Sequence, residues 1–319
     1  MDIILKQDIK GLGYKYDVVY WLVDIARSMD SFKMAGKTDL PLNRTNELLK
    51  KYITARQSHF NVLKTQYVAG NRLEIKESFL TTGYFNGEVL QRDKSGVFHL
   101  SWVWREKSDV STNHDMSYAK SLDGGRTWLS SKNENYTIPM NISNTKPILN
   151  IPEKSELINS TSLTTDDKGN PFIATYWRTQ NSTIPQYQLI YLKNSEWEVQ
   201  QVSNRKIPFS LSGVGTKRIP ISRPQVVVYK KTVLVIFRDE ERGSKISIAT
   251  NKNINNEVWN TIDVNNDEVG QWEPSYDTEL WLKKKQLHLF VQKTGQGDGE
   301  KTENLPAQMV KIVKVKLFN

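Results

Sequence analysis

Two patterns of apolar and polar positions divide this chain near residue 70. Before that point, apolar residues recur at helical spacing, in one stripe from Val18 to Phe32 and in a second from Leu48 to Tyr67. Residues three and four positions apart share one face of a helix. After residue 70, short runs of Val, Ile, Phe, Tyr and Trp alternate with Gly, Asn, Asp and Ser, which is typical of strands and turns. We therefore predict a helical hairpin over residues 1–70 and a β domain over residues 71–319.

The β region repeats one pattern four times: a strand, a tight polar turn, a more apolar second strand and then a third strand. The four repeats begin at Gly87, Thr161, Arg223 and Pro274. The first three continue to a fourth strand marked by Trp128, Trp197 or Trp259, whereas the last stops at its third strand. Repeated four-stranded units are the blades of a β-propeller. Residues 73–80 are the expected source of the missing strand, because an added strand removes exposed sheet edges.

The first repeat ends in a turn motif of specific sequence. Residues 121–128, SLDGGRTW, match the Asp-box pattern S-x-D-x-G-x-T-W. Its defining positions are Ser121, Asp123, Gly125, Thr127 and Trp128. We expect the Asp123 carboxylate to accept backbone N–H groups inside the turn, and the glycines to permit positive φ. This motif predicts a fold and says little about activity.

The residues around this turn resemble the BNR-repeat family of β-propellers from polysaccharide-degrading systems of Bacteroidetes. The resemblance covers about residues 80–319 and is carried by segments 98–128, 157–177, 217–228, 237–249 and 272–281. Family members include ulvan lyases, rhamnose–glucuronate lyases and an exo-α-rhamnosidase. The resemblance implies a lyase or glycoside hydrolase acting on acidic, uronate-containing polysaccharide. The mid-chain position of the tripeptide Arg218-Ile-Pro220 and the presence of one clear Asp-box make a sialidase the weaker fit.

Two departures from the family pattern support an alternative function. The family fold has seven blades, whereas this chain supplies about four, so the propeller is expected to be incomplete. The motifs that carry catalytic histidines in the early blades of family members do not occur here. The alternative is therefore a catalytically incomplete propeller that only binds glycan or a partner protein, with self-association through an open blade edge.

The first 19 residues resemble the start of bacterial large-subunit ribosomal protein nine. The match ends at Tyr20, before any Gly- and Arg-rich RNA-binding continuation, so we infer no ribosome binding. These residues do not form a signal peptide, although members of the BNR-repeat family are usually exported. Localisation therefore stays open at this point.

Composition narrows the choice of partners. A formal charge of +9 favours an anionic ligand, but no RNA-binding motif with stacking aromatics accompanies it, so nucleic acid is not expected. No apolar run reaches the length of a membrane span, so no membrane partner is expected. The chain has no cysteine, and the loop at 295–300 lacks calcium-ligand spacing, so no metal or cofactor is predicted.

The repeat alignment nominates residues that would meet at one end of the sheets. The second strands end at equivalent positions, which are Arg105, Arg178, Arg238 and Gln292. Guanidinium groups held together suit carboxylate or sulfate through paired charge-assisted hydrogen bonds. The innermost strands are entered at Asn86, Asn159, Arg223 and Glu273, which would bind sugar hydroxyls. For each set the competing interpretation is ordinary strand-end or turn chemistry.

Four residues are candidates for the chemistry itself. His114, oriented by Asp115, is the histidine that the alignment places in a loop at this end, and it would act as base or acid. Glu273 lies between aromatic residues that would raise its pKa, and Asp277 is a possible partner. Tyr176 is a hydroxyl donor for a leaving oxygen, as is Tyr118. A lyase also needs a cation for the uronate carboxylate.

Overall fold

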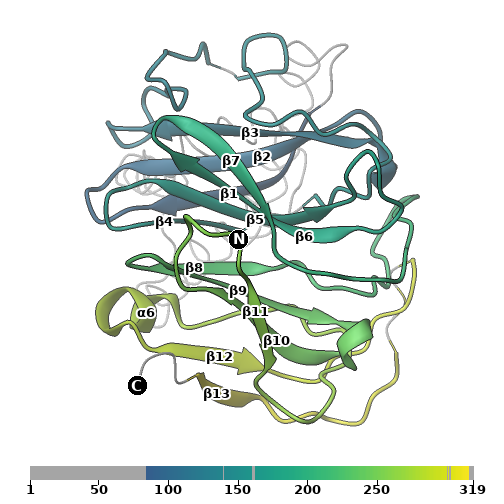
Figure 1. Ribbon diagram of the computed structural model, residues 1–319. Helices are drawn as coiled ribbons and strands as arrows, with labels where there is room; N and C mark the ends of the chain where they lie inside the picture. The colour runs from purple at the N-terminus through teal and green to yellow at the C-terminus, as the bar shows by residue number, and fades with distance from the viewer. Residues whose placement is uncertain (1–83, 139, 160–161, 300, 302, 316–319) are drawn as a thin grey trace, which may run out of the picture. The chain divides into compact units, whose positions relative to one another are not determined.

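The computed structural model describes residues 84–138, 140–159, 162–299, 301 and 303–315 (Figure 1). The predicted helical hairpin, the segment that resembles a ribosomal protein and the expected strand at 73–80 lie outside the described residues. The chain divides into two compact units, which we describe separately. The larger contains Asn86–Lys120 and the described residues from Lys146 onward, and the smaller contains Tyr84, Phe85 and the described residues of Ser121–Thr145.

The predicted mainly β architecture is confirmed. The elements are β1 (Tyr84–Arg92), β2 (Phe98–Arg105), η2 (Val110–Thr112), β3 (Asn113–Ser121), β4 (Ser162–Thr165), β5 (Pro171–Trp177), β6 (Gln186–Lys193), β7 (Glu196–Gln201), β8 (Gln225–Tyr229), β9 (Thr232–Asp239), η3 (Glu240–Arg242), β10 (Lys245–Asn251), β11 (Asn260–Asp263), α6 (Thr278–Lys284), β12 (Leu287–Val291) and β13 (Lys311–Val315). The sheets take these strands in chain order, as β1-β2-β3, β4-β5-β6-β7, β8-β9-β10-β11 and β12-β13.

Two of the four repeats form complete four-stranded antiparallel sheets. Their second strands, β5 and β9, are buried on both faces, which explains their nearly continuous apolar sequences. The predicted fourth strands match β7, which contains Trp197, and β11, which begins directly after Trp259. Trp128, in contrast, lies outside every described strand, so the first sheet has three strands.

The fourth repeat differs from the sequence prediction in its first element. Residues 278–284 form the helix α6 rather than a strand. Asp277 caps this helix by accepting a hydrogen bond from the backbone N–H of Leu280 at 2.8 Å. An acidic N-cap and lysines in the last turn both favour a helix. The side chain of Trp281 points into the core and is 3% exposed.

Three apolar clusters join successive sheets of the larger unit face to face. Val103, Met116, Leu163 and Ile173 share one cluster between the first two sheets. A second, with Tyr176, Tyr187, Val235 and Phe237, lies between the second and third sheets. A third, with Ile236, Ile246, Trp281 and Leu289, joins the third sheet to β12. Burying each large apolar side chain contributes about 1.5–3 kcal/mol to the stability of the fold, so these clusters hold each sheet against the next one along the chain.

Antiparallel order gives the sheets of the larger unit two distinct ends. The segments that leave the second strands, together with segment 202–224 between β7 and β8, lie at what we call the loop end. Hydrogen bonds between these segments show that they meet: Gly213 N–H donates to Asp109, and Arg218 N–H donates to Asp298. The turns that enter the second strands, at 93–97, 166–170, 230–231 and 285–286, lie at what we call the hairpin end.

Candidate functional site

A buried ion-pair network anchors the start of segment 202–224. The Nε atom of Arg205 lies 2.8 Å from Asp239 Oδ2, and its Nη2 lies 2.9 Å from Glu241 Oε1. The side chains of Arg205 and Asp239 are each 3% exposed. Burial raises the pKa of Asp239, while the charge of Arg205 opposes that rise. The Arg205 guanidinium also lies over the ring of Phe209, at 5.3 Å from its centroid.

Arg238 anchors the other limb of the same segment. Its guanidinium donates to the carbonyl oxygens of Ile219 and Pro220, both at 3.1 Å. It also donates to the Trp272 carbonyl and to Gln271 Oε1, each at 3.3 Å. The side chain is almost fully buried. Arg238 therefore fixes the backbone at the loop end.

Tyr176 lies beneath these two arginines. Its ring packs edge-on against Tyr187 and Phe209, with both centroid distances at 6.0 Å. The hydroxyl is buried and has no hydrogen-bond partner among the described residues. Burial raises the pKa of Tyr176, the charge of Glu273 adds to the rise, and nearby arginines oppose it. A buried hydroxyl without a hydrogen-bond partner lowers the stability of the fold. Because a ligand could supply the missing hydrogen bond, this hydroxyl is a candidate ligand contact.

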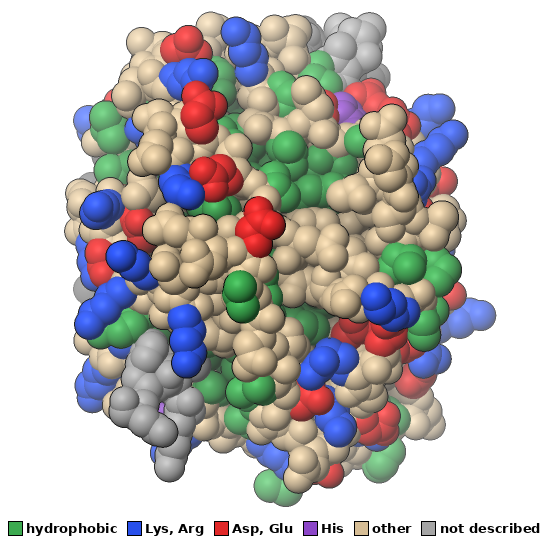
Figure 2. All heavy atoms as spheres, in the orientation of Figure 1, with side chains coloured by type: hydrophobic (Ala, Val, Ile, Leu, Met, Phe, Trp, Pro, Cys, Tyr) green, Lys and Arg blue, Asp and Glu red, His purple; other side chains and the backbone are tan. Residues whose placement is uncertain are grey.

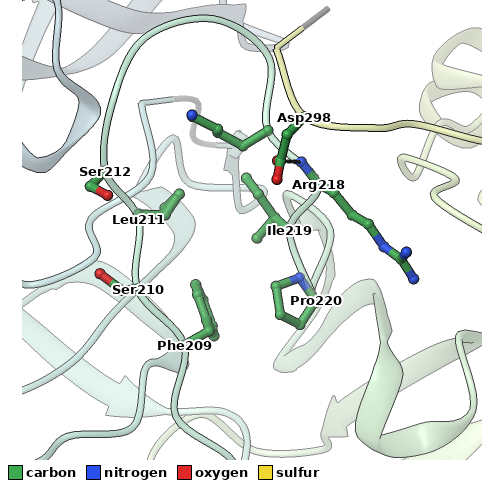
Figure 3. A pocket seen from close by; sticks show the side chains of 9 residues that line it. Phe209, Ser210, Leu211, Ser212, Arg218, Ile219, Pro220 and Asp298 are labelled. Carbon is green, nitrogen blue, oxygen red and sulfur yellow. Dashed lines mark hydrogen bonds between the residues drawn. The ribbon is translucent and has the colours of Figure 1, made fainter. Parts of the chain in front are cut away.

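A pocket of about 210 Å³ opens between the two limbs of segment 202–224 (Figure 3). Its lining residues are Phe209, Ser210, Leu211, Ser212, Lys217, Arg218, Ile219, Pro220 and Asp298. Leu211 and Ile219 face each other across it, while the Arg218 guanidinium points away (Figure 3). Lys217 Nζ lies against Gly213, where an added Cβ would come within 3.0 Å of it. The lining thus includes an aromatic residue, two serines and a lysine.

Glu273 and Arg223 form an ion pair on the rim of the loop end. The Glu273 Oε2 atom accepts hydrogen bonds from the Arg223 backbone N–H at 2.9 Å and from Arg223 Nε at 3.1 Å. Both side chains are nearly half exposed. Desolvation by the surrounding protein raises the pKa of Glu273, and Arg223 opposes that rise. A carboxyl group with a raised pKa is suited to proton transfer.

The structure brings some of the predicted residues together and holds others apart. Arg223, Arg238 and Glu273 all act electrostatically on Tyr176. Arg105, in contrast, donates to carbonyl oxygens of Lys107 and Ser108 in its own loop.

The remaining strand-end candidates also bind local partners. Arg178 Nε pairs with Glu156 at 2.6 Å, and its other nitrogens donate to the carbonyl oxygens of Lys154 and Ser182. Gln292 donates to the carbonyl oxygen of Gln308 at 3.0 Å. Four of the predicted residues therefore share one electrostatic environment, whereas Arg105, Arg178 and Gln292 have separate partners.

His114 lies between two carboxylates. Its Nδ1 is 3.1 Å from Asp115 Oδ2, and its Nε2 is 3.0 Å from Glu106 Oε1. Burial lowers the pKa of His114, but the hydrogen bonds and charges of Asp115 and Glu106 outweigh it, so the pKa is raised. Asp115 itself adopts φ 51° and accepts the Ile151 backbone N–H. This arrangement favours the imidazolium form, which donates protons and does not accept them.

The remaining predicted residues have the following places. Asn86 lies in β1, and Asn159 is half-buried in the segment before β4. In the smaller unit, Asp123 Oδ1 accepts hydrogen bonds from the N–H groups of Arg126 and Thr127, both at 3.0 Å. Gly125 has φ 89°, and its N–H donates to Ser121 Oγ at 2.7 Å. Trp128 is fully buried.

The sequence analysis did not identify Arg205, Phe209 or Lys217. Each stands alone in a long connecting segment, where no repeat or spacing marks it. Arg205 meets its partner Asp239 only after the chain has passed through two further strands. Within the described part of the chain, no group of three or more His, Asp or Glu side chains is arranged to hold a metal ion. No helix among the described residues is long and apolar enough to cross a membrane.

Comparison with known proteins gives one family match. The model of the BNR repeat-containing family matches residues 39–205, just over half of the chain. No curated protein sequence matches this chain.

Solved structures with a similar chain path include carbohydrate-active enzymes. A polysaccharide lyase, Uly1, is 13% identical over 73% of this chain and 46% of its own, with a TM-score of 0.46. A PL25 ulvan lyase is 13% identical over 72% of this chain and 53% of its own, with a TM-score of 0.47. The GH93 α-L-arabinofuranosidase of Fusarium graminearum is 14% identical over 72% of this chain and 61% of its own, with a TM-score of 0.42. This chain therefore spans less than two thirds of the length of each.

Proposed function

Because this chain belongs to the BNR repeat-containing family, we propose that it binds a uronate-containing polysaccharide at its loop end and acts on it as a lyase or glycoside hydrolase. The observation that carries the proposal is the environment of Tyr176. A buried, unpartnered hydroxyl packs beneath Phe209 and is influenced by the charges of Glu273 and of three arginines, Arg205, Arg223 and Arg238. Phe209 also lines the adjacent pocket, where Lys217 is a cation that favours a carboxylate-bearing sugar.

The proposal includes a propeller arrangement in which each sheet is one blade. Support comes from the three apolar clusters that join successive sheets in chain order. In such an arrangement the loop end is the face on which blades share a ligand.

The pocket at 209–220 supplies the binding contacts. Phe209 offers an apolar ring to a sugar face, Ser210 and Ser212 offer hydroxyl groups, and Lys217 offers a cation to a uronate carboxylate. A few polar groups placed in a concave, partly apolar site are what orient a ligand. Asn159 and Arg223 extend the proposed binding surface along the segments that enter β4 and β8.

β-Elimination is the reaction that these residues serve best. A base removes the proton on the carbon next to the uronate carboxylate, the electron pair forms a carbon–carbon double bond, and the bridging oxygen leaves with a proton. Glu273 is suited to be the base, since its pKa is raised while it stays ionisable. Burial keeps the Tyr176 hydroxyl neutral, so it is suited to protonate the leaving oxygen once the Phe209 ring that packs on it moves aside. His114 holds its proton between two carboxylates, which suits a donor better than a base.

The test measures products and binding separately. Purified protein is incubated with a panel of acidic glycans, and unsaturated products are followed by ultraviolet absorbance, with reducing sugar as the readout of hydrolysis. We expect Glu273→Gln and Tyr176→Phe to abolish turnover while binding persists, and Lys217→Ala to weaken binding. Release of saturated sugar would identify a hydrolase instead. Absence of both binding and products across the panel would refute the proposal.

One observation favours a second candidate, glycan binding without turnover. The guanidinium groups of Arg105, Arg178 and Arg238 are engaged by carbonyl oxygens or Glu156. A lyase needs a cation that reaches the uronate carboxylate. If the wild-type chain retains acidic glycan and releases no product, this second function is correct.

A further inference from the structure

The hairpin end of the larger unit carries a cluster of lysines that the loop-end site does not use. Lys94 lies in the turn from β1 to β2, Lys230 in the turn from β8 to β9, and Lys285 directly before β12. All three act on one carboxylate, that of Asp167 in the turn from β4 to β5. Lys94 forms an ion pair with Asp167, and this bond, together with the charges of Lys94, Lys285 and Lys230, lowers the pKa of Asp167. Four turns from four successive sheets therefore lie within electrostatic reach of the Asp167 carboxylate.

Two of these lysines adopt a backbone conformation that disfavours their side chains. Lys230 and Lys285 both have φ 55°, in the left-handed region. In the corresponding turns of the first two sheets, glycine takes the positive φ, at Gly96 and Gly169. Glycine accepts this region without steric cost, whereas a lysine does not. Lys285 adopts this conformation as the left-handed C-cap of α6, and Lys230 adopts it in the two-residue turn between β8 and β9.

The cluster holds more positive charge than its carboxylates balance. The four turns carry five lysines, Lys94, Lys168, Lys230, Lys231 and Lys285, against three carboxylates, those of Asp93, Asp166 and Asp167. Lys285 is half-buried, and its pKa is lowered by desolvation and by the charge of Lys94. Lys and Arg side chains gather along the side of the molecule where Figure 1 draws α6 (Figure 2). An arriving anion would therefore relieve repulsion at the hairpin end.

We propose that Lys94, Lys230 and Lys285 form a second binding site, which takes the carboxylate or sulfate groups of an acidic sugar polymer. The ammonium groups come from sheets that pack about 10 Å apart, so they suit a chain with repeated charges better than one isolated ion. The aromatic residues beneath them are covered: Lys285 lies over Trp281, which is 3% exposed, and Lys230 lies over Tyr229. The lysines that cover these two rings disfavour stacking of nucleic-acid bases on them.

The test compares charge-matched variants of the full chain on two polymers, dextran sulfate and polygalacturonate, with neutral dextran as the blank. The triple variant Lys94→Gln/Lys230→Gln/Lys285→Gln should bind dextran sulfate at least about tenfold more weakly, with a reduced dependence on salt. The control variant replaces three exposed lysines elsewhere, Lys132, Lys146 and Lys301, by Gln and should bind like the wild type. Equal binding by the two triple variants would overturn the proposal.

Two further arms make the result specific. Lys230→Gly removes a charge while relieving the backbone, so we expect weaker binding together with unchanged or greater stability. DNA of equal charge density should bind more weakly than the sulfated polymer, and equal or tighter binding of DNA would refute the assignment to a sugar chain. The loop-end site is tested separately with Lys217→Ala on polygalacturonate. Lys217→Ala could lose binding to polygalacturonate while the Lys94/Lys230/Lys285 variant binds both polymers fully. That result would support the proposed function at the loop end and refute the second site at the hairpin end.

Discussion

Asp239 and Arg205 illustrate how the loop end depends on a buried ion pair. Both side chains are 3% exposed, and Arg205 also bonds the carbonyl oxygen of Ile207 at 3.0 Å. Removing one partner leaves the other buried charge uncompensated, so Asp239→Asn should lower the free energy of unfolding by about 3–5 kcal/mol. Urea denaturation measures this loss. The exposed pair Lys283–Glu279 is the control, because Glu279→Gln should cost less than about 1 kcal/mol. Equal losses would show that burial does not set the strength of the Asp239–Arg205 pair.

Tyr176 and Tyr187 offer a matched pair of buried hydroxyls. Tyr187 donates to the carbonyl oxygens of Ser222 and Arg238 at 2.8 and 3.0 Å, whereas Tyr176 has no partner among the described residues. Tyr187→Phe should therefore cost about 1–2 kcal/mol of stability, and Tyr176→Phe should cost close to nothing or stabilise slightly. Thermal and urea unfolding of both variants measure the difference. A large loss in Tyr176→Phe would show that its hydroxyl serves the fold and would weaken its assignment to a ligand.

His114 should make stability depend on pH. Its pKa in the folded state lies above the ordinary value of 6.5, so the folded protein binds the proton more tightly than the unfolded chain. Its contribution is fully present below about pH 6 and is lost as the pH rises through the folded-state pKa. His114→Gln should therefore destabilise the protein more at about pH 5 than at about pH 9. Unfolding free energies of both proteins at the two pH values measure this, and a larger effect at alkaline pH would contradict the ion pairs with Glu106 and Asp115.

At the scale of a single turn, the β8–β9 hairpin gives a clean test of backbone strain. Lys230 has φ 55°, whereas its neighbour Lys231 does not have a positive φ. Lys230→Gly should stabilise the protein by up to about 1 kcal/mol, because glycine enters the left-handed region freely. Lys231→Gly removes the same charge and should destabilise by about 0.5–1 kcal/mol through added freedom of the unfolded chain. Melting temperatures that shift in the same direction for both variants would contradict this account.

Elements that depend on local pattern could be predicted from the sequence, and those that depend on distant partners could not. The second strands β5 and β9 were predicted because burial on both faces requires continuous apolar runs. The repeat pattern predicts a strand where α6 lies, because Tyr276, Leu280 and Trp281 are apolar residues common in strands. The N-cap residue Asp277 instead favours the helix that forms. Arg205 could not be predicted from the sequence, because its structural role depends on ion pairs with Asp239 and Glu241. Tertiary packing, and not local sequence, brings these carboxylates next to it. For the same reason, the repeats nominate Arg105 as a ligand-binding residue but do not show that backbone carbonyl oxygens of its own loop accept its hydrogen bonds.

At the end of the larger unit, the last sheet has an outer face that carries exposed apolar side chains and no neighbouring sheet among the described residues. β12 and β13 pack one face on the cluster containing Leu289 and Val313, while Phe290 and Ile312, paired across the two strands, are 39% and 57% exposed. Met309 and Val310 continue this apolar surface at 78% and 63% exposure. An exposed apolar strand at a sheet edge is a template for association.

We therefore expect the protein to self-associate with rising concentration, and Ile312→Lys to suppress this by placing a charge on the contact face. Sedimentation velocity over a range of concentrations measures the effect. Val258→Lys is the control, because Val258 is 73% exposed but lies before β11, away from the last sheet. If Ile312→Lys and the wild type sediment identically as monomers, the exposed face does not drive association. If both variants suppress it equally, added charge rather than this surface is responsible, and the last sheet needs no second copy to cover it.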